Sequence, residues 1–218
     1  YESFKSADLT DMLPAVISEW SKLVPHFDGI LTGFLLCDTQ YKYVLEFIDT
    51  FKQKDTLLLV DPVMADNGEI YATYTPEMVE GVKRLCEKAD IITPNLTELR
   101  ILSGEEDIML GGKKMLERGI KSVIVTGVVE NGKIANYVFH GDITKKYETE
   151  FIKSATEGGS FSGTGDIFSS FVLGKVLNGF SVFQAVEQAV EFISKAIKAS
   201  NIKNRNDGID FEPFLKNI

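Results

Sequence analysis

Hydrophobic positions follow two alternating patterns along this sequence. Longer segments carry apolar side chains at three- and four-residue spacing, which is typical of amphipathic helices. Short apolar runs lie between them, and residues 56–60 (Thr-Leu-Leu-Leu-Val) are the clearest of these runs. Such runs are typical of strands that are buried on both faces of a parallel sheet.

The pattern predicts helices and strands that alternate along the whole chain. Helices are expected over residues 7–23, 39–54, 76–88, 96–102, 111–118, 166–177 and 182–199, and strands over 29–33, 56–60, 90–93 and 122–126. Asn131-Gly132 is a strong hairpin signal, so segments 124–129 and 134–139 should pair antiparallel. We therefore expect an α/β fold with a mostly parallel sheet, helices on both faces, and an antiparallel edge near residues 124–153.

Composition and charge narrow the possible functions. The 218 residues contain no linker rich in Pro, Gly or Ser, which favours one domain. A net charge of −9 opposes binding to a polyanion, so we expect no nucleic-acid partner. No apolar stretch approaches the roughly 18 residues of a membrane span. With only two cysteines and no visible signal peptide, the sequence predicts a cytoplasmic protein.

Carboxylates follow the strand predicted over residues 56–60. In a parallel sheet, ligands bind beyond the carboxyl ends of the strands, so these positions are candidate site residues. Asp61 stands directly at the strand end, where a buried carboxylate needs a partner that a cation would supply. Asp66 lies in Asp66-Asn67-Gly68, a segment that by itself favours a simple turn.

The next two strand ends also carry polar residues. Asn95 and Glu98 follow Thr93 and lie three residues apart at a helix start, so they face the same side. Two interpretations are open: their oxygens suit Mg²⁺, or the pair forms a capping box. Thr126-Gly127 comes after Val125, at the end of the strand predicted over residues 122–126, and places a hydroxyl beside a flexible residue.

The strongest local signal is Ser162-Gly163-Thr164-Gly165-Asp166, which an apolar helical segment follows. Two glycines let successive backbone N–H groups converge, and the helix adds the positive end of its dipole. This arrangement suits charge that develops on a transferring phosphoryl group. Asp166 could accept the proton of an attacking hydroxyl. The alternative interpretation is a glycine turn with Asp166 as the N-cap of the helix.

Other nucleotide and metal motifs do not fit. Gly111-Gly112-Lys113-Lys114 lacks the first glycine and the hydroxyl residue of a P-loop. Phe168 stands where a dinucleotide-binding motif needs its third glycine. The two histidines, His26 and His140, lack the spacing of a zinc site.

Taken in this order, the motifs resemble the ribokinase superfamily and, more closely, its pyridoxal kinase family. The resemblance rests on segments 28–34, 60–64, 89–95 with Glu98, 123–128 and 163–166. It implies a three-layer sandwich and transfer of phosphate from Mg-ATP to the 5′-hydroxymethyl group of pyridoxal, pyridoxine or pyridoxamine. It also implies a homodimer. Hydroxymethylpyrimidine kinase, another small-alcohol kinase, and a nucleotide-binding protein without turnover are the alternatives.

The resemblance also implies roles for the individual residues. Asp166 would be the catalytic base, and the anion hole would be lined by Gly163, Thr164 and Gly165. Asp61 and Thr93 would lie near Mg²⁺ and a monovalent cation, K⁺ or Na⁺, and Glu98 would hold Mg²⁺ through water. The ATP contacts would come from Asp66, Asn95, Thr126, Gly127 and Thr164. The family begins with a strand and a glycine-containing loop that supply much of the vitamin pocket, and we expect this chain to lack them.

Overall fold

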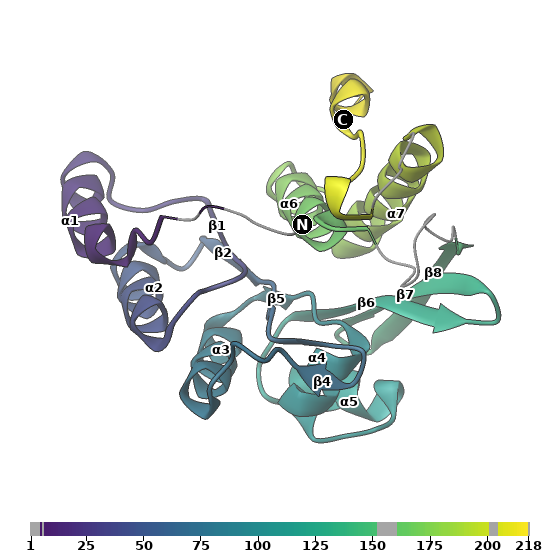
Figure 1. Ribbon diagram of the computed structural model, residues 1–218, viewed down its shortest axis with the longest axis horizontal. Coiled ribbons are helices and arrows are strands. Elements are labelled where there is room, and N and C mark those ends of the chain that lie inside the picture. The colour runs from purple at the N-terminus through teal and green to yellow at the C-terminus, as the bar shows by residue number, and fades with distance from the viewer. Residues whose placement is uncertain (1–4, 6, 152–160, 201–204, 218) are drawn as a thin grey trace.

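A mixed sheet forms the centre of the computed structural model, which describes residues 5, 7–151, 161–200 and 205–217 (Figure 1). The strands lie in the order β1 (Gly29–Thr32), β2 (Leu57–Val60), β5 (Ile91–Ile92), β6 (Ser122–Glu130), β7 (Lys133–His140) and β8 (Ile143–Glu150). The pairs from β1 to β6 are parallel, and β6, β7 and β8 pair antiparallel. The predicted α/β fold with an antiparallel edge is confirmed up to Glu150, whereas residues 152 and 153 lie outside the described ranges.

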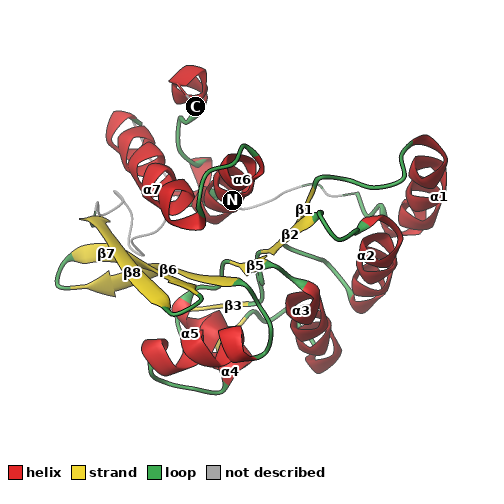
Figure 2. Ribbon diagram, turned by 180° about the vertical axis from the view of Figure 1, so that it is seen from behind, coloured by secondary structure: helices red, strands yellow, loops and turns green. Residues whose placement is uncertain are grey.

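Helices cover both faces of this sheet (Figure 2). One face packs against α2 (Asp38–Phe51), α3 (Pro76–Lys88), α4 (Leu96–Ser103) and α5 (Ile108–Glu117), and α1 (Leu13–Leu23) lies outside α2. The other face packs against α6 (Thr164–Leu177) and α7 (Val182–Ala199). Alternation along β2 serves both layers, because Leu58 and Val60 join the first core and Leu59 joins the second.

Short elements complete the described fold. Three short 3₁₀ helices are η1 (Thr10–Met12), η2 (Arg205–Asp207) and η3 (Glu212–Asn217). A two-stranded hairpin, β3 (Ala65–Asp66) and β4 (Glu69–Ile70), encloses the turn expected at Asp66-Asn67-Gly68. Among the helices in the described ranges, none combines the length and the apolar character needed to cross a membrane.

Local chemistry explains where several helices begin. Thr75 accepts a hydrogen bond from Met78 N and precedes a proline at the first helical position of α3. The first helix was predicted from residue 7, but α1 begins at Leu13. Pro14 explains this difference, because proline lacks an N–H and clashes with the preceding turn, so it lies only near a helix start.

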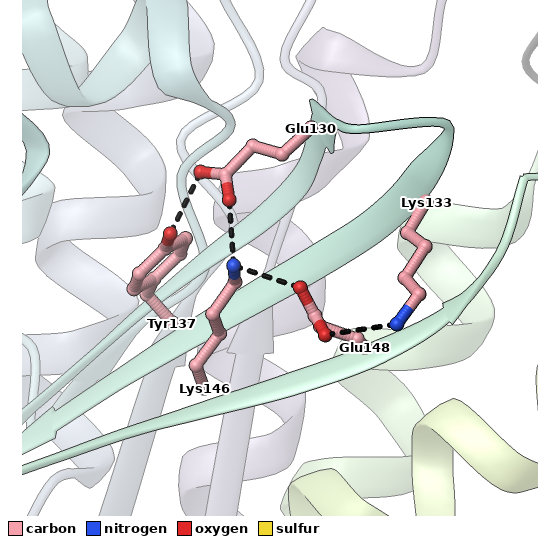
Figure 3. A network of polar contacts seen from close by, with 5 residues as sticks. All are labelled: Glu130, Lys133, Tyr137, Lys146 and Glu148. Carbon is pink, nitrogen blue, oxygen red and sulfur yellow. Dashed lines mark hydrogen bonds and ion pairs between the residues drawn. The ribbon is translucent and has the colours of Figure 1, made fainter.

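The antiparallel strands are linked by a network of polar side chains (Figure 3). Lys146 of β8 lies 2.6 Å from Glu130 of β6 and 2.8 Å from Glu148, and Lys133 of β7 lies 3.3 Å from Glu148. Tyr137 Oη donates a 2.7 Å hydrogen bond to Glu130. The network therefore ties all three strands together on the face that turns away from α7.

Candidate active site

The carboxyl ends of β1 and β2 meet the start of α6. Asp61 N donates a 2.8 Å hydrogen bond to Thr32 O, which joins the two strand ends. A Cβ atom added to Gly165 would lie 3.8 Å from Asp61 Oδ2, and one added to Gly33 would lie 3.9 Å from Asp166 Oδ1. Segments that lie far apart in the sequence thus bring two carboxylates together at this edge of the sheet.

Asp61 is a buried carboxylate, only 9% exposed. Among the described residues no basic side chain forms an ion pair with Asp61, and its carboxylate accepts hydrogen bonds from hydroxyl groups. Ser169 Oγ donates to Asp61 Oδ2 over 3.4 Å and lies 2.9 Å from Thr93 Oγ1. Burial, and then the negative charge of Asp166, raise the pKa of Asp61 to about 7, although hydrogen bonds from Thr93 and Ser169 oppose the rise. Such a group favours a bound cation.

Hydroxyl and carboxylate oxygens lie at the carboxyl ends of these strands. Thr32 Oγ1 is the one buried side-chain oxygen in the described ranges that lacks a hydrogen-bond partner. On the face of the sheet that α6 covers, Asp61 and Thr93 both approach Ser169 and offer the hard oxygen donors that Mg²⁺ or K⁺ prefers. The described residues contain no group of three or more His, Cys, Asp or Glu side chains that could hold a metal ion. The donors therefore fit an ion whose remaining ligands are water and phosphate oxygens, as is usual for Mg²⁺.

The capping-box interpretation of Asn95 and Glu98 is confirmed. Asn95 Oδ1 accepts from Glu98 N, and Glu98 Oε2 accepts from Asn95 N, both over 2.9 Å. Glu98 Oε1 accepts from Met64 N over 3.1 Å, and Asn95 Nδ2 donates to Ala65 O over 2.7 Å. Burial raises the pKa of Glu98 to about 8 despite these N–H donors, and Asp61 adds to the rise. The contacts to ATP and Mg²⁺ stay predictions.

The first turn of α6 begins earlier than predicted. Gly163 is the N-cap with φ of 81°, and the helix starts at Thr164, two residues before the expected start at Asp166. The interpretation of Asp166 as an N-cap is therefore wrong, because it is the third helical residue and its side chain is exposed. Gly163 allows the early start because its positive φ turns the chain into the helix axis. The first backbone N–H groups of α6 have no partner within the helix.

A cavity of about 280 Å³ lies between the antiparallel strands and the helices α6 and α7. It brings together five residues predicted to bind ATP or to form the anion hole: Asp66, Thr126, Gly127, Thr164 and Gly165. Its apolar lining includes Val129, Ile134, Phe168, Val190 and Ile193. Asn95 is not among the lining residues.

Asp166 lies on the opposite side of the same helical turn. It lines a second cavity of about 750 Å³, together with Ile167, Ser170 and Phe171. The first turn of α6 thus separates a cavity lined by Thr164 and Gly165 from one reached by the Asp166 carboxylate.

Sequence reasoning missed two polar residues near the site. Ser169 is 1% exposed and bonds to the residues at two strand ends, and Asn136 is 6% exposed and lines the smaller cavity. Each is a polar residue within an apolar segment, and this was the available signal. Whether such a residue belongs to a site depends on the strand end or cavity that it faces, and only the folded structure shows this.

Sequence comparison identifies a family. The profile of the phosphomethylpyrimidine kinase family matches residues 10–209. The pyridoxine kinase of Bacillus subtilis is 31% identical over 69% of this chain and 58% of its own length. A hydroxymethylpyrimidine/phosphomethylpyrimidine kinase of Aquifex aeolicus is 32% identical over 92% of this chain and 79% of its own. The chain spans only 58–65% of the length of three curated relatives.

Solved structures agree with this result. A protein of Bacteroides thetaiotaomicron, provisionally described as a phosphomethylpyrimidine kinase and crystallised with pyridoxal, has a TM-score of 0.89 and 35% identity. The match covers 100% of this chain and 79% of that one. The pyridoxal kinase of Staphylococcus aureus in complex with ADP has a TM-score of 0.71 and 26% identity, and the match covers 92% and 69% of the two chains.

Proposed function

Because this chain belongs to the phosphomethylpyrimidine kinase family, we propose that it transfers the terminal phosphoryl group of ATP to a small heteroaromatic alcohol. The acceptor in this proposal is the 5′-hydroxymethyl group of pyridoxal, pyridoxine or pyridoxamine. The observation that carries it is the first turn of α6, which has a cavity on one side and the Asp166 carboxylate on the other.

In the proposed reaction, Asp166 accepts the proton of the acceptor hydroxyl while the hydroxyl oxygen attacks the γ-phosphorus atom. A new oxygen–phosphorus bond forms, the bond between the γ-phosphorus and the β–γ bridging oxygen breaks, and ADP leaves with the electron pair of that bond. The N–H groups at the start of α6, around Gly163, Thr164 and Gly165, stabilise the negative charge of the transferring group. Their fixed positions mean that little reorganisation is needed during the reaction.

The acidic strand ends would hold the cations that this reaction needs. Asp61 and Thr93 would bind near Mg²⁺ and a monovalent cation, and Glu98 would reach Mg²⁺ through water. When bound, Mg²⁺ would neutralise phosphate charge, which is needed in a chain of net charge −9. The proposal also includes a homodimer and a cytoplasmic location.

A second acceptor, hydroxymethylpyrimidine, is favoured by one observation. The Aquifex aeolicus relative with that name is 32% identical over 92% of this chain. Measuring ADP release from Mg-ATP with pyridoxal, pyridoxine, pyridoxamine and hydroxymethylpyrimidine would separate the two acceptors.

The first test of the proposed base is Asp166→Asn. We expect ADP release to fall by about 10²–10⁴, the usual effect of losing a general base, while ATP binding is retained. Asp38→Asn is the matched control, because Asp38 is also an exposed aspartate in the first turn of a helix. Turnover at the wild-type rate in Asp166→Asn would contradict the assignment.

A further inference from the structure

Asn136 is a polar residue in the floor of the smaller cavity. It lies in β7 between Ala135 and Tyr137, is 6% exposed, and lines the cavity together with Ile134. Burying an amide group is unfavourable unless it forms hydrogen bonds. The position therefore calls for an explanation in terms of its partners.

One half of this amide has a clear partner. The register of β6 and β7 shifts between Val125 and Val128, so Thr126 and Gly127 together oppose Asn136 in a β-bulge. Gly127 has φ of 68°, and its N–H donates to Asn136 Oδ1 over 3.3 Å. The side-chain oxygen thus replaces a backbone acceptor that the bulge removes from the ladder.

The other half of the amide, the Nδ2 group, has no partner among the described residues. Asn136 Nδ2 forms no hydrogen bond within the described part of the chain, and the residue borders the cavity. Tyr137, the next residue, belongs to the network on the reverse face of the strands (Figure 3). Because side chains alternate along a strand, Asn136 is held on the cavity face.

We propose that Asn136 Nδ2 donates a hydrogen bond to the nucleoside part of the bound ATP, either to a ring nitrogen of the base or to a ribose oxygen. This inference rests on the proposed function. The apolar lining from Val129, Ile134 and Ile193 suits a flat base, and Asn136 supplies a directional donor within it. The proposed function puts the phosphates at Thr164 and Gly165 of α6, whereas Asn136 belongs to β7, so we assign Asn136 to the nucleoside rather than to the phosphates.

The test measures binding by titration calorimetry of the wild-type protein and of Asn136→Leu, with Mg²⁺ present. The two probes are ATP and inorganic tripolyphosphate, which lacks the nucleoside. We expect the Kd for ATP to rise about tenfold in Asn136→Leu, the effect of one lost hydrogen bond, and the Kd for tripolyphosphate to stay unchanged. Equal weakening for both probes, or an unchanged Kd for ATP, would overturn the inference.

Lys146→Met is the matched control for the stability of the strands. It removes the centre of the network on the reverse face without touching the cavity. If Lys146→Met lowers the melting temperature as much as Asn136→Leu does, it should still bind ATP with the Kd of the wild type. If it weakens ATP binding as much as Asn136→Leu does, the effect of Asn136 is structural and the inference fails.

Nucleotide analogues identify the acceptor without depending on the variant's folding. The wild type is titrated with 1-deaza-, 3-deaza- and 7-deaza-ATP and with ATP analogues that lack one ribose hydroxyl or carry a methylene in place of the ring oxygen. We expect one analogue to bind less tightly, and Asn136→Leu or the smaller Asn136→Ser to be insensitive to that change. If no analogue weakens binding, the inference is wrong. If the wild type binds no ATP at all, the proposed function itself fails.

Discussion

Asp61 and Asp90 are buried aspartates, one after the carboxyl end of β2 and the other before the amino end of β5. Replacing them should change the pH dependence of the free energy of unfolding in opposite directions. Asp90 precedes β5 and lies 2.8 Å from Lys121 and 3.1 Å from Lys52, and it also accepts from Leu58 N. Burial tends to raise the pKa of Asp90, but these partners outweigh it and lower the pKa. Asp61 has no such cation among the described residues and faces Asp166 instead.

The expected sign and size follow from proton linkage. Between the ordinary pKa of 3.8 and the folded-state pKa of about 7, folded Asp61 holds a proton that the unfolded chain releases. The free energy of unfolding therefore falls as pH rises through this window, by about 4 kcal/mol at 1.36 kcal/mol per pH unit. The lowered pKa of Asp90 acts in the opposite direction. Ionised Asp90 stabilises the fold above pH 3.8, and this stabilisation is lost as the pH falls through the folded-state pKa of Asp90.

Urea unfolding at pH 5, 6, 7 and 8, without Mg²⁺ or nucleotide, measures these effects. We expect Asp61→Asn to flatten the decline and to be more stable than the wild type at pH 8. A residual decline remains from Glu98, whose pKa is about 8. Asp90→Asn should lose about 1–3 kcal/mol at pH 7, because it breaks charged hydrogen bonds. If Asp61→Asn keeps the wild-type pH dependence, then Asp61 is not the unpaired buried charge described above.

Three further predictions address packing, the metal site and the surface network. Gly112→Ala should destabilise the fold by about 1–3 kcal/mol in urea unfolding, because its Cβ would lie 2.5 Å from the Phe139 ring, whereas Gly174→Ala meets nothing within 4 Å and should not. Glu98→Gln should raise the Mg²⁺ concentration needed for half-maximal ADP release, and an unchanged titration would remove Glu98 from the metal site. Lys146→Met should lower the melting temperature more at low salt than at high salt, and an equal loss at both would show that the network contributes no net charge attraction.

Much of the fold could be predicted because its signals are local. The apolar run at residues 56–60 and the Asn131-Gly132 turn both identify their elements from adjacent residues, and the structure has β2 and the β6–β7 hairpin there. β8 is mostly polar, with Ile143 and Tyr147 as its apolar residues, and was expected only as part of an edge. Its strand state depends on pairing with β7, which no local pattern within Ile143–Glu150 encodes.

The candidate site could be predicted only for residues whose place at a strand end already implies that they lie close together. Because parallel strands end at one edge, Asp61 and Thr93 could be expected to lie close together, and Ser169 Oγ contacts both of them. The partners of Asn136 could not be foreseen, since they depend on a bulge that places Gly127 opposite it. The three-residue spacing of Asn95 and Glu98 fits both a pair of Mg²⁺ ligands and a capping box. Only the directions of the hydrogen bonds identified the cap.

β6 is the strand at which the sheet changes from parallel to antiparallel pairing, and this has a consequence for the order of folding. β6, β7 and β8 follow one another over residues 122–150 with short turns, whereas β1, β2 and β5 are joined through intervening helices. Local pairings form early because little loop entropy is lost, and parallel pairings form late. We therefore expect amides of residues 122–150 to gain protection first in pulse-labelled hydrogen exchange. The floor of the cavity would then be assembled before α6 and α7 close over it.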